Sequence, residues 1–437
     1  MPRAGGAVEE SEALRRAETA FASSVRADLP RNFLAHLAHG LLGQTGMRLV
    51  NAPTFIPLYV FSLSGSELAV GVARSLQYLG MFASPIVGAT IIEHRPRVLR
   101  VGLLVGALMR VQILGLALGG ILLSPPGPLV SCFVFLALFG VFLGVQGVVF
   151  NFLVAKVIPV EVRGRLVGLR NALSGLTAAA VAWYAGDVLI EGNALGNGYA
   201  ATFLMAFALT SCGLLMLLFL REPASPRVRE AAAVRQRLGE LPALLRSDPE
   251  FTRYFMARAL AVMGRMAVPF YALHAQARLE LSGAEWGQLT AIFVLMESVG
   301  SLLWGAVADR TGFRRVFLAA LLIWMLSGVA LLLTSSFAWL AIVFAGLGAG
   351  LGGFQMSAQN LVLEFGSRHN LPLRIAVANS ASEFVAAVGA LLGGLLGMLV
   401  SHTAVFVVAI ASQAVAAGIV VFGVREPRSR PGAVTPR

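Results

Sequence analysis

The sequence predicts an all-α integral membrane protein with twelve transmembrane helices arranged as two six-helix halves. Hydrophobic residues make up 57% of the 437-residue chain and charged residues only 13%, whereas a soluble domain carries about 25% charged residues. About twelve apolar runs reach the roughly 20 residues that a bilayer span needs. One long polar segment, residues 221–250, divides these runs six and six. Helices are expected because lipid cannot satisfy open backbone groups, and the runs are too long and continuous for the alternating strands of a β-barrel.

The expected spans follow one another with short polar gaps. They lie at 33–61, 67–92, 99–123, 128–157, 167–190, 199–220, 252–275, 284–308, 314–334, 337–363, 372–400 and 402–423. The expected segments are a cytoplasmic tail (1–31), a first bundle (32–220), a cytoplasmic linker (221–250), a second bundle (251–424) and a cytoplasmic tail (425–437). The first tail mixes acids and arginines and has no apolar core of a signal peptide, so we expect it to be partly disordered or to lie on a surface.

The net charge of +12 comes from arginines that gather in every second gap between spans. The alternate gaps, such as "SLSGSE", "SPPGP" and "TSSF", are nearly free of basic residues. This asymmetry is the positive-inside pattern and places both termini and the linker in the cytoplasm. The charge therefore reports topology, and a nucleic-acid partner is not expected. The single lysine, Lys156, suggests a GC-rich bacterial genome, so the expected location is a bacterial inner membrane.

An internal repeat relates the two halves. The segment "GMRLVNAPTFIPLYVFSLSGSELAVG" (46–71) resembles "MGRMAVPFYALHAQARLELSGAEWG" (263–287). In both, an arginine precedes a proline, a phenylalanine and then Leu-Ser-Gly. The segment "GATIIEHRPRVLR" (88–100) occupies the position in the first half that "GAVADRTGFRRVF" (305–317) occupies in the second. Parallel repeats of this kind are typical of membrane transporters built around a central pathway.

The segment 305–317 resembles the loop signature of the major facilitator superfamily, which connects the second and third helices of a half. The matching residues are Gly305, Asp309, Arg310, Gly312, Arg314 and Arg315. Phe313 departs from the family pattern, which often has a base directly after the second glycine. In the degenerate first-half copy, Glu93 stands for the acid, His94 and Arg95 for the base, and Pro96 for the second glycine. Glu93, Arg95 and Arg97 are the candidate gating residues of this copy. The resemblance covers essentially the whole chain and implies two pseudo-symmetric bundles that rock around a midplane site, giving alternating access.

The signature residues are expected to act as a gate at the cytoplasmic end. Gly305 would let another helix approach closely. Asp309 would pair with the arginines or cap a helix across the interface between the halves. The alternative is a plain positive anchor, which accounts for the arginines but does not require Asp309 or Gly312.

Several charged and polar residues fall inside expected spans, where they are costly and usually face a cavity or a partner. Arg48 lies in span 1, and Arg265 lies at the equivalent position of span 7. The resemblance implies that spans 1, 4, 7 and 10 line the pathway. Guanidiniums offer bidentate donors to a carboxylate or phosphate; the alternative is that nearby acids neutralise them. The candidate substrate-binding residues are Gln44, Arg48, Asn51, Arg265, Gln355 and Gln359.

Two carboxylates, Glu297 in span 8 and Glu383 in span 11, are candidates for proton coupling. A buried carboxylate beside an arginine can exchange a proton when its surroundings change, although a static ion pair is the equal alternative. Arg74 and Asp187 both fall in the outer third and are expected to pair. Arg110 in span 3 has no partner that the sequence reveals.

These features favour a secondary active transporter of a small organic solute, anionic or amphiphilic, with ion or proton coupling or exchange. Proton-driven drug efflux is the alternative, although span 4 lacks an arginine and span 5 lacks a Gly-Pro pair. A transporter-like sensor or assembly factor is the alternative from another class. No enzyme, metal or cofactor is expected, because His36 and His39 have no third ligand nearby and the glycine-rich runs lack a nucleotide motif. The expected partners are the solute and the lipid bilayer, with the chain acting as a monomer.

Overall fold

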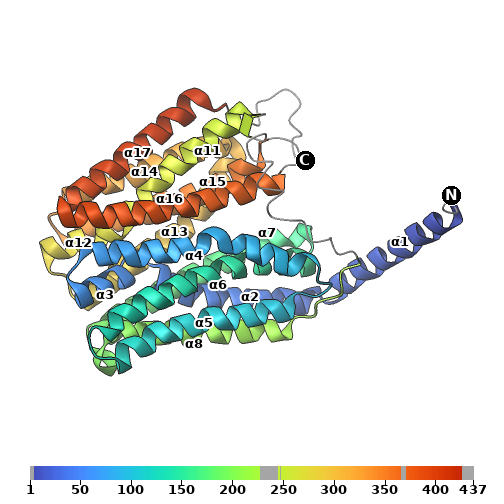
Figure 1. The fold of residues 1–437 in the computed structure, drawn as a ribbon, viewed down its shortest axis with the longest axis horizontal. Helices are drawn as coiled ribbons and strands as arrows, with labels where there is room; N and C mark the ends of the chain where they lie inside the picture. Colours follow the sequence, from blue (N-terminus) through green and yellow to red (C-terminus); the bar gives the residue numbers. More distant parts are fainter. Residues whose placement is uncertain (1–3, 227–244, 247, 366–370, 426–437) are drawn as a thin grey trace.

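A computed structural model describes residues 4–226, 245–246, 248–365 and 371–425 of the chain (Figure 1). Every regular element in these ranges is a helix. Most of the linker expected at 221–250 and nearly all of the tail expected at 425–437 lie outside the described residues.

The first half runs from α2 to α8. Its elements are α2 (Leu29–Asn51), α3 (Phe55–Ser64), α4 (Glu67–Glu93), α5 (Leu99–Leu122), α6 (Gly127–Val157), α7 (Val160–Tyr184), the π-helical turn η1 (Ala185–Ile190), the 3-10 turn η2 (Ala194–Gly196), α8 (Gly198–Met216) and the 3-10 turn η3 (Leu217–Phe219). Together α2 and α3 form span 1, and η1 continues α7 to complete span 5.

The second half repeats this order. Its elements are α11 (Pro249–Val262), the 3-10 segment η4 (Met263–Ala267), α12 (Val268–Leu279), α13 (Gly283–Thr311), α14 (Phe313–Leu332), α15 (Phe337–Leu363), α16 (Leu371–Leu399) and α17 (His402–Gly423). Here α11, η4 and α12 together form span 7, the repeat equivalent of span 1.

Ten segments of the described chain are long and apolar enough to cross a membrane. The two expected spans outside this set are spans 1 and 7, which are interrupted near their middles. With these two interrupted spans, the described residues account for all twelve expected spans, and the predicted fold class is confirmed. The break in span 1 follows from Pro53, which has no N–H to donate and disfavours a helical conformation at the preceding residue. Ala52 is accordingly extended, with φ −54° and ψ 148°.

The first tail differs from the expectation. Residues 4–27 form helix α1, which projects away from the bundle (Figure 1). Alanine, glutamate and arginine dominate this segment, and all three favour helices. Glu12 and Arg16 also form an exposed i,i+4 ion pair of 3.5 Å, of the kind that stabilises isolated helices. The polar composition predicts a segment that is partly disordered or lies on a surface, but its high helix propensity gives a helix that leaves the bundle.

The halves meet through α4 against α16 and through α7 against α13. In Figure 1 the start of α2, from which α1 projects, and the C-terminal end of α17 lie at one end of the bundle, here called the termini end, while α3 and α12 lie at the opposite, far end. Glycines permit the closest contacts between the halves. A Cβ on Gly71 would lie 2.6 Å from Ala390 O and 2.7 Å from Gly394 Cα, so α4 and α16 are in backbone contact here.

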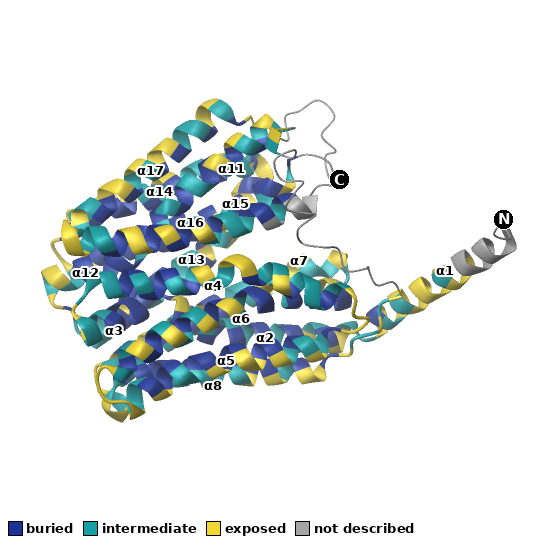
Figure 2. Ribbon diagram, viewed as in Figure 1, coloured by how far each residue is buried: buried dark blue, intermediate teal, exposed yellow. Residues whose placement is uncertain are grey.

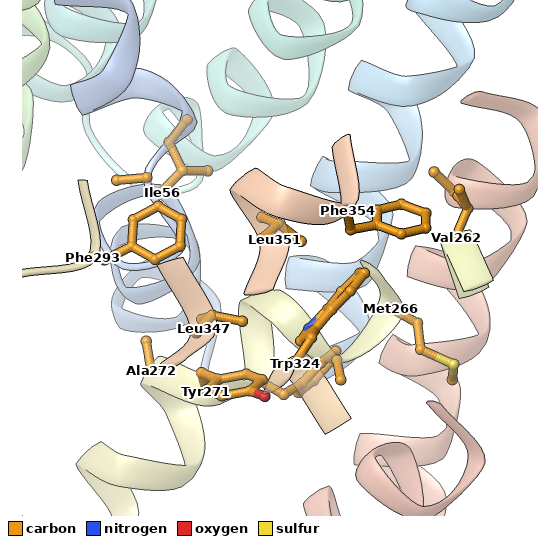
Figure 3. Packing of buried hydrophobic residues seen from close by; sticks show 14 of the residues in the cluster. Ile56, Val262, Met266, Tyr271, Ala272, Phe293, Trp324, Leu347, Leu351 and Phe354 are labelled. Atoms are coloured by element: carbon orange, nitrogen blue, oxygen red, sulfur yellow. The ribbon is translucent and has the colours of Figure 1, made fainter. Parts of the chain in front are cut away.

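The hydrophobic core extends across the two halves. Ile56 of α3 lies beside Phe293 of α13, while Leu351 and Phe354 of α15 pack toward Trp324 of α14 (Figure 3). The outer surface is also apolar, since many large side chains are exposed along the helices (Figure 2). Such extended exposed apolar surface marks an interaction surface, which for helices of this length is the lipid bilayer.

Candidate functional site

The interruption of span 1 is stabilised by an arginine from the neighbouring helix. Arg74 of α4 donates from Nη2 to the carbonyl oxygen of Ala52 at 2.8 Å and from Nη1 to Gln77 Oε1 at 2.9 Å. Carbonyl groups at a helix end need such partners when water is absent. The expected pairing of Arg74 with Asp187 is therefore wrong, and Asp187 is exposed on η1.

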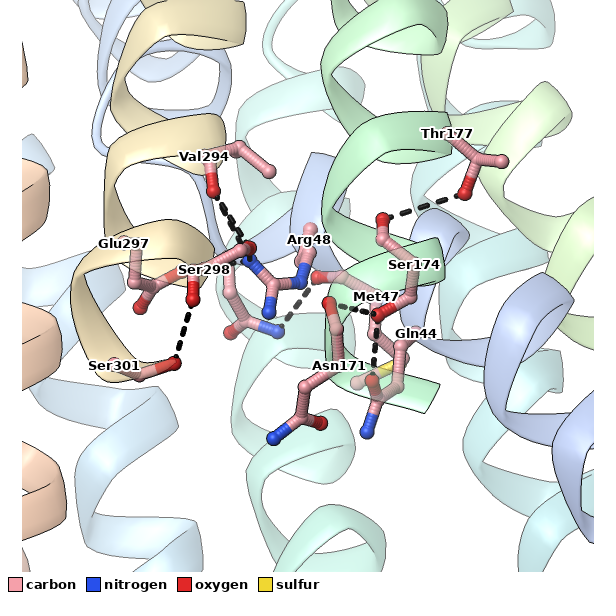
Figure 4. Close-up of polar contacts among 11 residues, drawn as sticks. Gln44, Met47, Arg48, Asn171, Ser174, Thr177, Val294, Glu297, Ser298 and Ser301 are labelled. Atoms are coloured by element: carbon pink, nitrogen blue, oxygen red, sulfur yellow. Dashed lines mark hydrogen bonds and ion pairs between the residues drawn. The ribbon is translucent and has the colours of Figure 1, made fainter. Parts of the chain in front are cut away.

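Arg48, one turn before the interruption, connects the two halves (Figure 4). Its Nη1 donates to Glu297 Oε2 at 3.1 Å, to Ser298 Oγ at 2.6 Å and to Val294 O at 3.3 Å, all on α13. The side chains of Arg48 and Glu297 are 18% and 23% exposed. The ion pair is thus mostly enclosed and still reachable by solvent.

Polar side chains extend this site along α2. Gln44 Oε1 accepts a hydrogen bond from Ser174 Oγ of α7 at 2.8 Å (Figure 4). Asn51 Oδ1 accepts one from Gln77 Nε2 of α4 at 2.9 Å. On α2, Gln44 therefore contacts α7, Arg48 contacts α13 and Asn51 contacts α4. The side chain of Asn51 is also exposed.

Arg265 occupies the corresponding interruption of span 7. Its Nη1 donates to the two carboxylate oxygens of Glu383 at 3.2 and 3.4 Å, and these side chains are 21% and 20% exposed. The guanidinium also stacks on Tyr78 of α4, with its central carbon 4.3 Å from the ring centre. Arg265 thus binds an acid within its own half and an aromatic ring of the other half. The sequence analysis did not identify Tyr78, which follows Gln77 in span 2.

Arg110 and Arg258, which also lie inside the spans, are held by neutral oxygen atoms. Arg110 donates from Nε to Thr210 O at 2.6 Å and from Nη1 to Gly106 O at 2.7 Å. Arg258 donates to Ala358 O at 3.3 Å and to Asn379 Oδ1 at 2.8 Å. Gln355 and Gln359 are exposed, one turn apart on α15.

In the second-half loop signature, each residue has a distinct setting. Gly312 has φ +89° and its N–H bonds to Ala308 O at 2.8 Å, ending α13 as glycine does at a helix C-terminus. Arg314 donates to the carbonyl oxygens of Val420 and Val421 at the end of α17. Asp309, Arg310 and Arg315 are exposed.

Gly305 does not have the packing role expected of it in this conformation. A Cβ placed on Gly305 would meet nothing within 4 Å among the described residues. Close approach of another helix therefore does not explain the glycine here.

In the first half a different set of residues stabilises the loop between α4 and α5. Glu222 accepts hydrogen bonds from the N–H groups of Val98 and Leu99, between 2.8 and 3.0 Å, at the start of α5. Lys156 Nζ lies 2.7 Å from Glu222 Oε1 and 2.6 Å from Pro96 O. The side chains of Lys156 and Glu222 are 4% and 2% exposed. Arg95 and Arg97 are exposed on the same loop, and Glu93 is half-buried.

The sequence analysis missed this pair. The only feature of the sequence that could have pointed to the Lys156–Glu222 pair is that Lys156 is the sole lysine in the chain.

Further contacts join the halves at the far end. Glu191 Oε2 accepts from Gly283 N at 2.6 Å, at the first turn of α13. Glu67 Oε1 lies 3.6 Å from His402 Nε2. Thr54 and Thr290 share a hydrogen bond of 2.6 Å. Neither Glu67 nor Glu191 was identified from the sequence, because their partners lie in the other half.

Among the described residues, no group of three His, Cys, Asp or Glu is placed to hold a metal ion. His36 and His39 lie on α2 near Arg170, and His39 also lies near Arg110.

Comparison with known proteins adds a family and a fold. Residues 254–437 match the family model described as Major Facilitator Superfamily. The structure resembles that of a D-xylose-proton symporter, with a TM-score of 0.71 and 14% identity over 92% of this chain and 99% of that one. It also resembles a point mutant of the nucleoside transporter NupG, with a TM-score of 0.65 and 13% identity over 90% and 98% of the two chains.

A third similar structure is a bacterial homologue of the human lysosomal transporter Spinster, in an inward-facing and unoccupied conformation. Its TM-score is 0.62 and its identity 12%, over 92% of this chain and 96% of that one. At such low identities these likenesses establish the fold alone. No curated protein matches the sequence.

Proposed function

We propose that the chain is a member of the major facilitator superfamily, whose family model matches residues 254–437, and that it is a secondary active transporter that moves a small organic solute by alternating access. The observation that carries the proposal is the ion pair between Arg48 and Glu297, because it joins the two halves at the depth where spans 1 and 7 are interrupted. A solute that binds between them would change how strongly the halves hold together.

The proposed solute carries a carboxylate, phosphate or similar anionic group, on a small or amphiphilic body. Such a group would compete with Glu297 for Arg48 and with Glu383 for Arg265, since a guanidinium binds an incoming oxyanion as it binds a carboxylate. Neutral donors and acceptors for the rest of the solute would come from Gln44, Asn51, Gln355 and Gln359.

Proton coupling follows from charge balance at this site. A displaced carboxylate, left without its arginine in a mostly enclosed position, favours its protonated form. Uptake of one proton by Glu297 or Glu383 for each bound anion keeps the net charge of the site constant. The alternative is exchange of one anion for another without protonation.

Alternating access would open and close the contacts at the two ends in turn. The far end is held together by Glu67 with His402 and by Glu191 with Gly283. We infer that this conformation is closed at the far end and that the termini end is cytoplasmic, with Asp309 and its neighbours acting when that end closes. One chain carries both halves, so a monomer suffices, in a bacterial inner membrane.

Orientation is tested by cysteine labelling. A cysteine introduced in the 221–250 segment should resist a membrane-impermeant maleimide in intact cells and react after permeabilisation. Labelling in intact cells would invert the proposed topology.

Transport is tested in liposomes. A thermal-shift screen of the purified protein against anions, cations and neutral amphiphiles identifies the solute, because a ligand that binds the folded state raises the melting temperature. With that solute, Glu297→Gln and Glu383→Gln identify the coupling residue. The variant at the coupling position should lose gradient-driven accumulation while keeping exchange, since exchange needs no net proton movement.

The competing outcomes are distinct. Loss of accumulation and exchange together would assign that carboxylate to structure or binding. Binding of lipophilic cations that depends on Glu297 or Glu383 but not on Arg48 or Arg265 would favour efflux. Ligand binding without any flux would favour the sensor alternative.

A further inference from the structure

A second cluster of basic side chains lies in the first half, nearer the termini end than Arg48. Three of its members surround the ring of Phe150 on α6. The ring centres of His36 and His39 lie 5.5 and 4.8 Å from the Phe150 ring centre, and the guanidinium carbon of Arg170 lies 5.3 Å from it. His36 and His39 come from α2 and Arg170 from α7.

The hydrogen-bonding capacity of this cluster is incompletely used by the protein. His39 Nδ1 bonds to Gly213 O at 2.9 Å. His36 is fully buried, and neither of its ring nitrogens has a partner among the described residues; Nε of Arg170 is also buried without one. Buried polar atoms are almost always satisfied, and leaving one unpaired destabilises the folded protein.

The charge of the cluster is also unbalanced. Arg110 of α5 contributes a further positive charge to the surroundings of His39, and its described hydrogen bonds go to backbone carbonyls. The helices α2, α5 and α6 contain no Asp or Glu, and α7 contains only Glu161, in its first turn and exposed. Positive charges with no acid on the same helices require compensation from elsewhere.

We propose that His36, His39 and Arg170 form a second anion-binding site, which takes an oxyanion such as a phosphate or sulfate group. His36 supplies a ring nitrogen as donor, Arg170 supplies the guanidinium, and Arg110 adds a positive potential from behind. The anion is either free in solution or carried on a lipid headgroup, and the same donors recognise both. The site does not depend on the solute proposed for Arg48.

The backbone of α2 is adapted to this arrangement at Gly40. The side chain of Arg170 crosses α2 directly over this glycine, and a Cβ at residue 40 would collide with its Cγ and Cδ. His36, Gly40, Gln44 and Arg48 are spaced four residues apart and share one face of the helix. The site therefore lies on the polar face that leads from Arg48 toward the termini end, with His36 about 18 Å from Arg48 along the helix.

The test measures anion binding directly. Purified protein in nanodiscs made only of zwitterionic phosphatidylcholine is titrated with inorganic phosphate and with sulfate in gluconate buffer, and the melting temperature is followed. We expect a saturable rise in the wild type. Gly40→Ala and Arg170→Gln should each weaken apparent affinity at least tenfold.

Matched controls separate the site from general effects. Gly168→Ala, on α7, places a Cβ in open space, and Arg165→Gln removes a neighbouring exposed charge; both should bind within twofold of wild type. His36→Phe keeps an aromatic ring at this position and removes both nitrogens, so it keeps the test decisive if Gly40→Ala does not fold. A phosphate response that Arg48→Gln removes and that Arg170→Gln and His36→Phe keep would belong to the central site, and that result would overturn the proposal.

A second arm distinguishes the source of the anion. Protein in nanodiscs containing phosphatidylglycerol is examined by native mass spectrometry for retained anionic lipid. Retention that Arg170→Gln and His36→Phe abolish assigns the site to a headgroup, while a saturable response in phosphatidylcholine alone assigns it to a free anion. Absence of both, or binding unchanged in Gly40→Ala, Arg170→Gln and His36→Phe, would overturn the proposal.

Discussion

In the first half, arginines inside the spans are held mainly by amide and backbone oxygens, whereas in the second half carboxylates lie among them. Arg74 and Arg110 bond to carbonyl oxygens, and Arg74 also to Gln77. Glu297 and Glu383 are both in the second half, where Glu383 holds Arg265 and Glu297 reaches across to Arg48. Under the proposed function, the second half supplies the groups that can exchange protons, and the first half supplies fixed positive charge.

The two halves also differ in the loops at the termini end, namely the loop between α4 and α5 and the loop between α13 and α14. In the first half, Lys156 and Glu222 form an enclosed ion pair that caps α5. In the second half, Asp309 and Arg310 are exposed and Arg314 caps α17. The first-half loop is therefore held by a buried ion pair, while Asp309, Arg310 and Arg315 of the second-half signature are exposed.

The largest expected loss of stability comes from breaking the ion pair between Lys156 and Glu222 in the first half. Removing one partner of a buried pair leaves an uncompensated charge and costs roughly 3–5 kcal/mol. We expect Glu222→Gln to lower the melting temperature of the purified protein strongly. Asp248→Asn, which removes the partner of Arg374 in the second half at 2.7 Å, should cost less because the Asp248 side chain is 17% exposed. Equal losses would remove the contrast between the halves.

The next largest effect is a loss of solute affinity when either central arginine, Arg48 or Arg265, is replaced. Arg48→Ala and Arg265→Ala should each weaken binding of an anionic solute by roughly 10- to 150-fold, the equivalent of a charged hydrogen bond worth about 1.5–3 kcal/mol. Lysine should rescue either variant poorly, because it lacks the bidentate fork. Isothermal titration in detergent measures both. If Arg48→Ala binds the solute with unchanged affinity, Arg48 serves only as the counter-charge of Glu297 and does not contact the solute.

A smaller effect, on closure of the far end, is expected from replacing the packed glycine Gly71 but not from replacing Gly305. Gly71→Ala should hinder closure of the far end, because its Cβ would meet Ala390 O and Gly394. Gly305→Ala should leave this conformation undisturbed, since its Cβ would meet open space. Reaction of a cysteine introduced at Thr54 with a thiol reagent reports opening of the far end. Similar labelling in both variants would show that the α4–α16 contact does not control closure.

The smallest effect concerns the loop signature. Asp309→Asn should lower the turnover rate several-fold while leaving solute affinity and the melting temperature nearly unchanged, because the residue lies at an exposed helix end. Glu93→Gln, its degenerate first-half counterpart, should have a weaker effect on turnover. Transport assays in liposomes compare the two variants. If Asp309→Asn transports at the wild-type rate, the loop signature acts only as a positively charged membrane anchor and not as a gate.

Much of the fold was determined by the sequence alone. Length and apolar content decide whether a segment can cross a bilayer, and both are local properties, so the twelve spans could be predicted. Pro53 equally specifies an interruption in span 1, since its missing N–H acts within one turn. The candidate site could be predicted as a set of residue types, because Arg48, Arg265, Glu297 and Glu383 stand out against an apolar background.

Only the tertiary structure decided which of these residues meet. Arg48 and Glu297 are 249 residues apart, and no local pattern specifies their contact. Arg74 was expected to bind an acid but caps Ala52, because a backbone carbonyl oxygen can accept a hydrogen bond from a guanidinium without leaving any signal in the sequence. The cluster of His36, His39 and Arg170 likewise exists only because α2, α6 and α7 pack around Phe150. Local chemistry thus specified the helices, whereas pairing of buried charges depended on distances that packing alone creates.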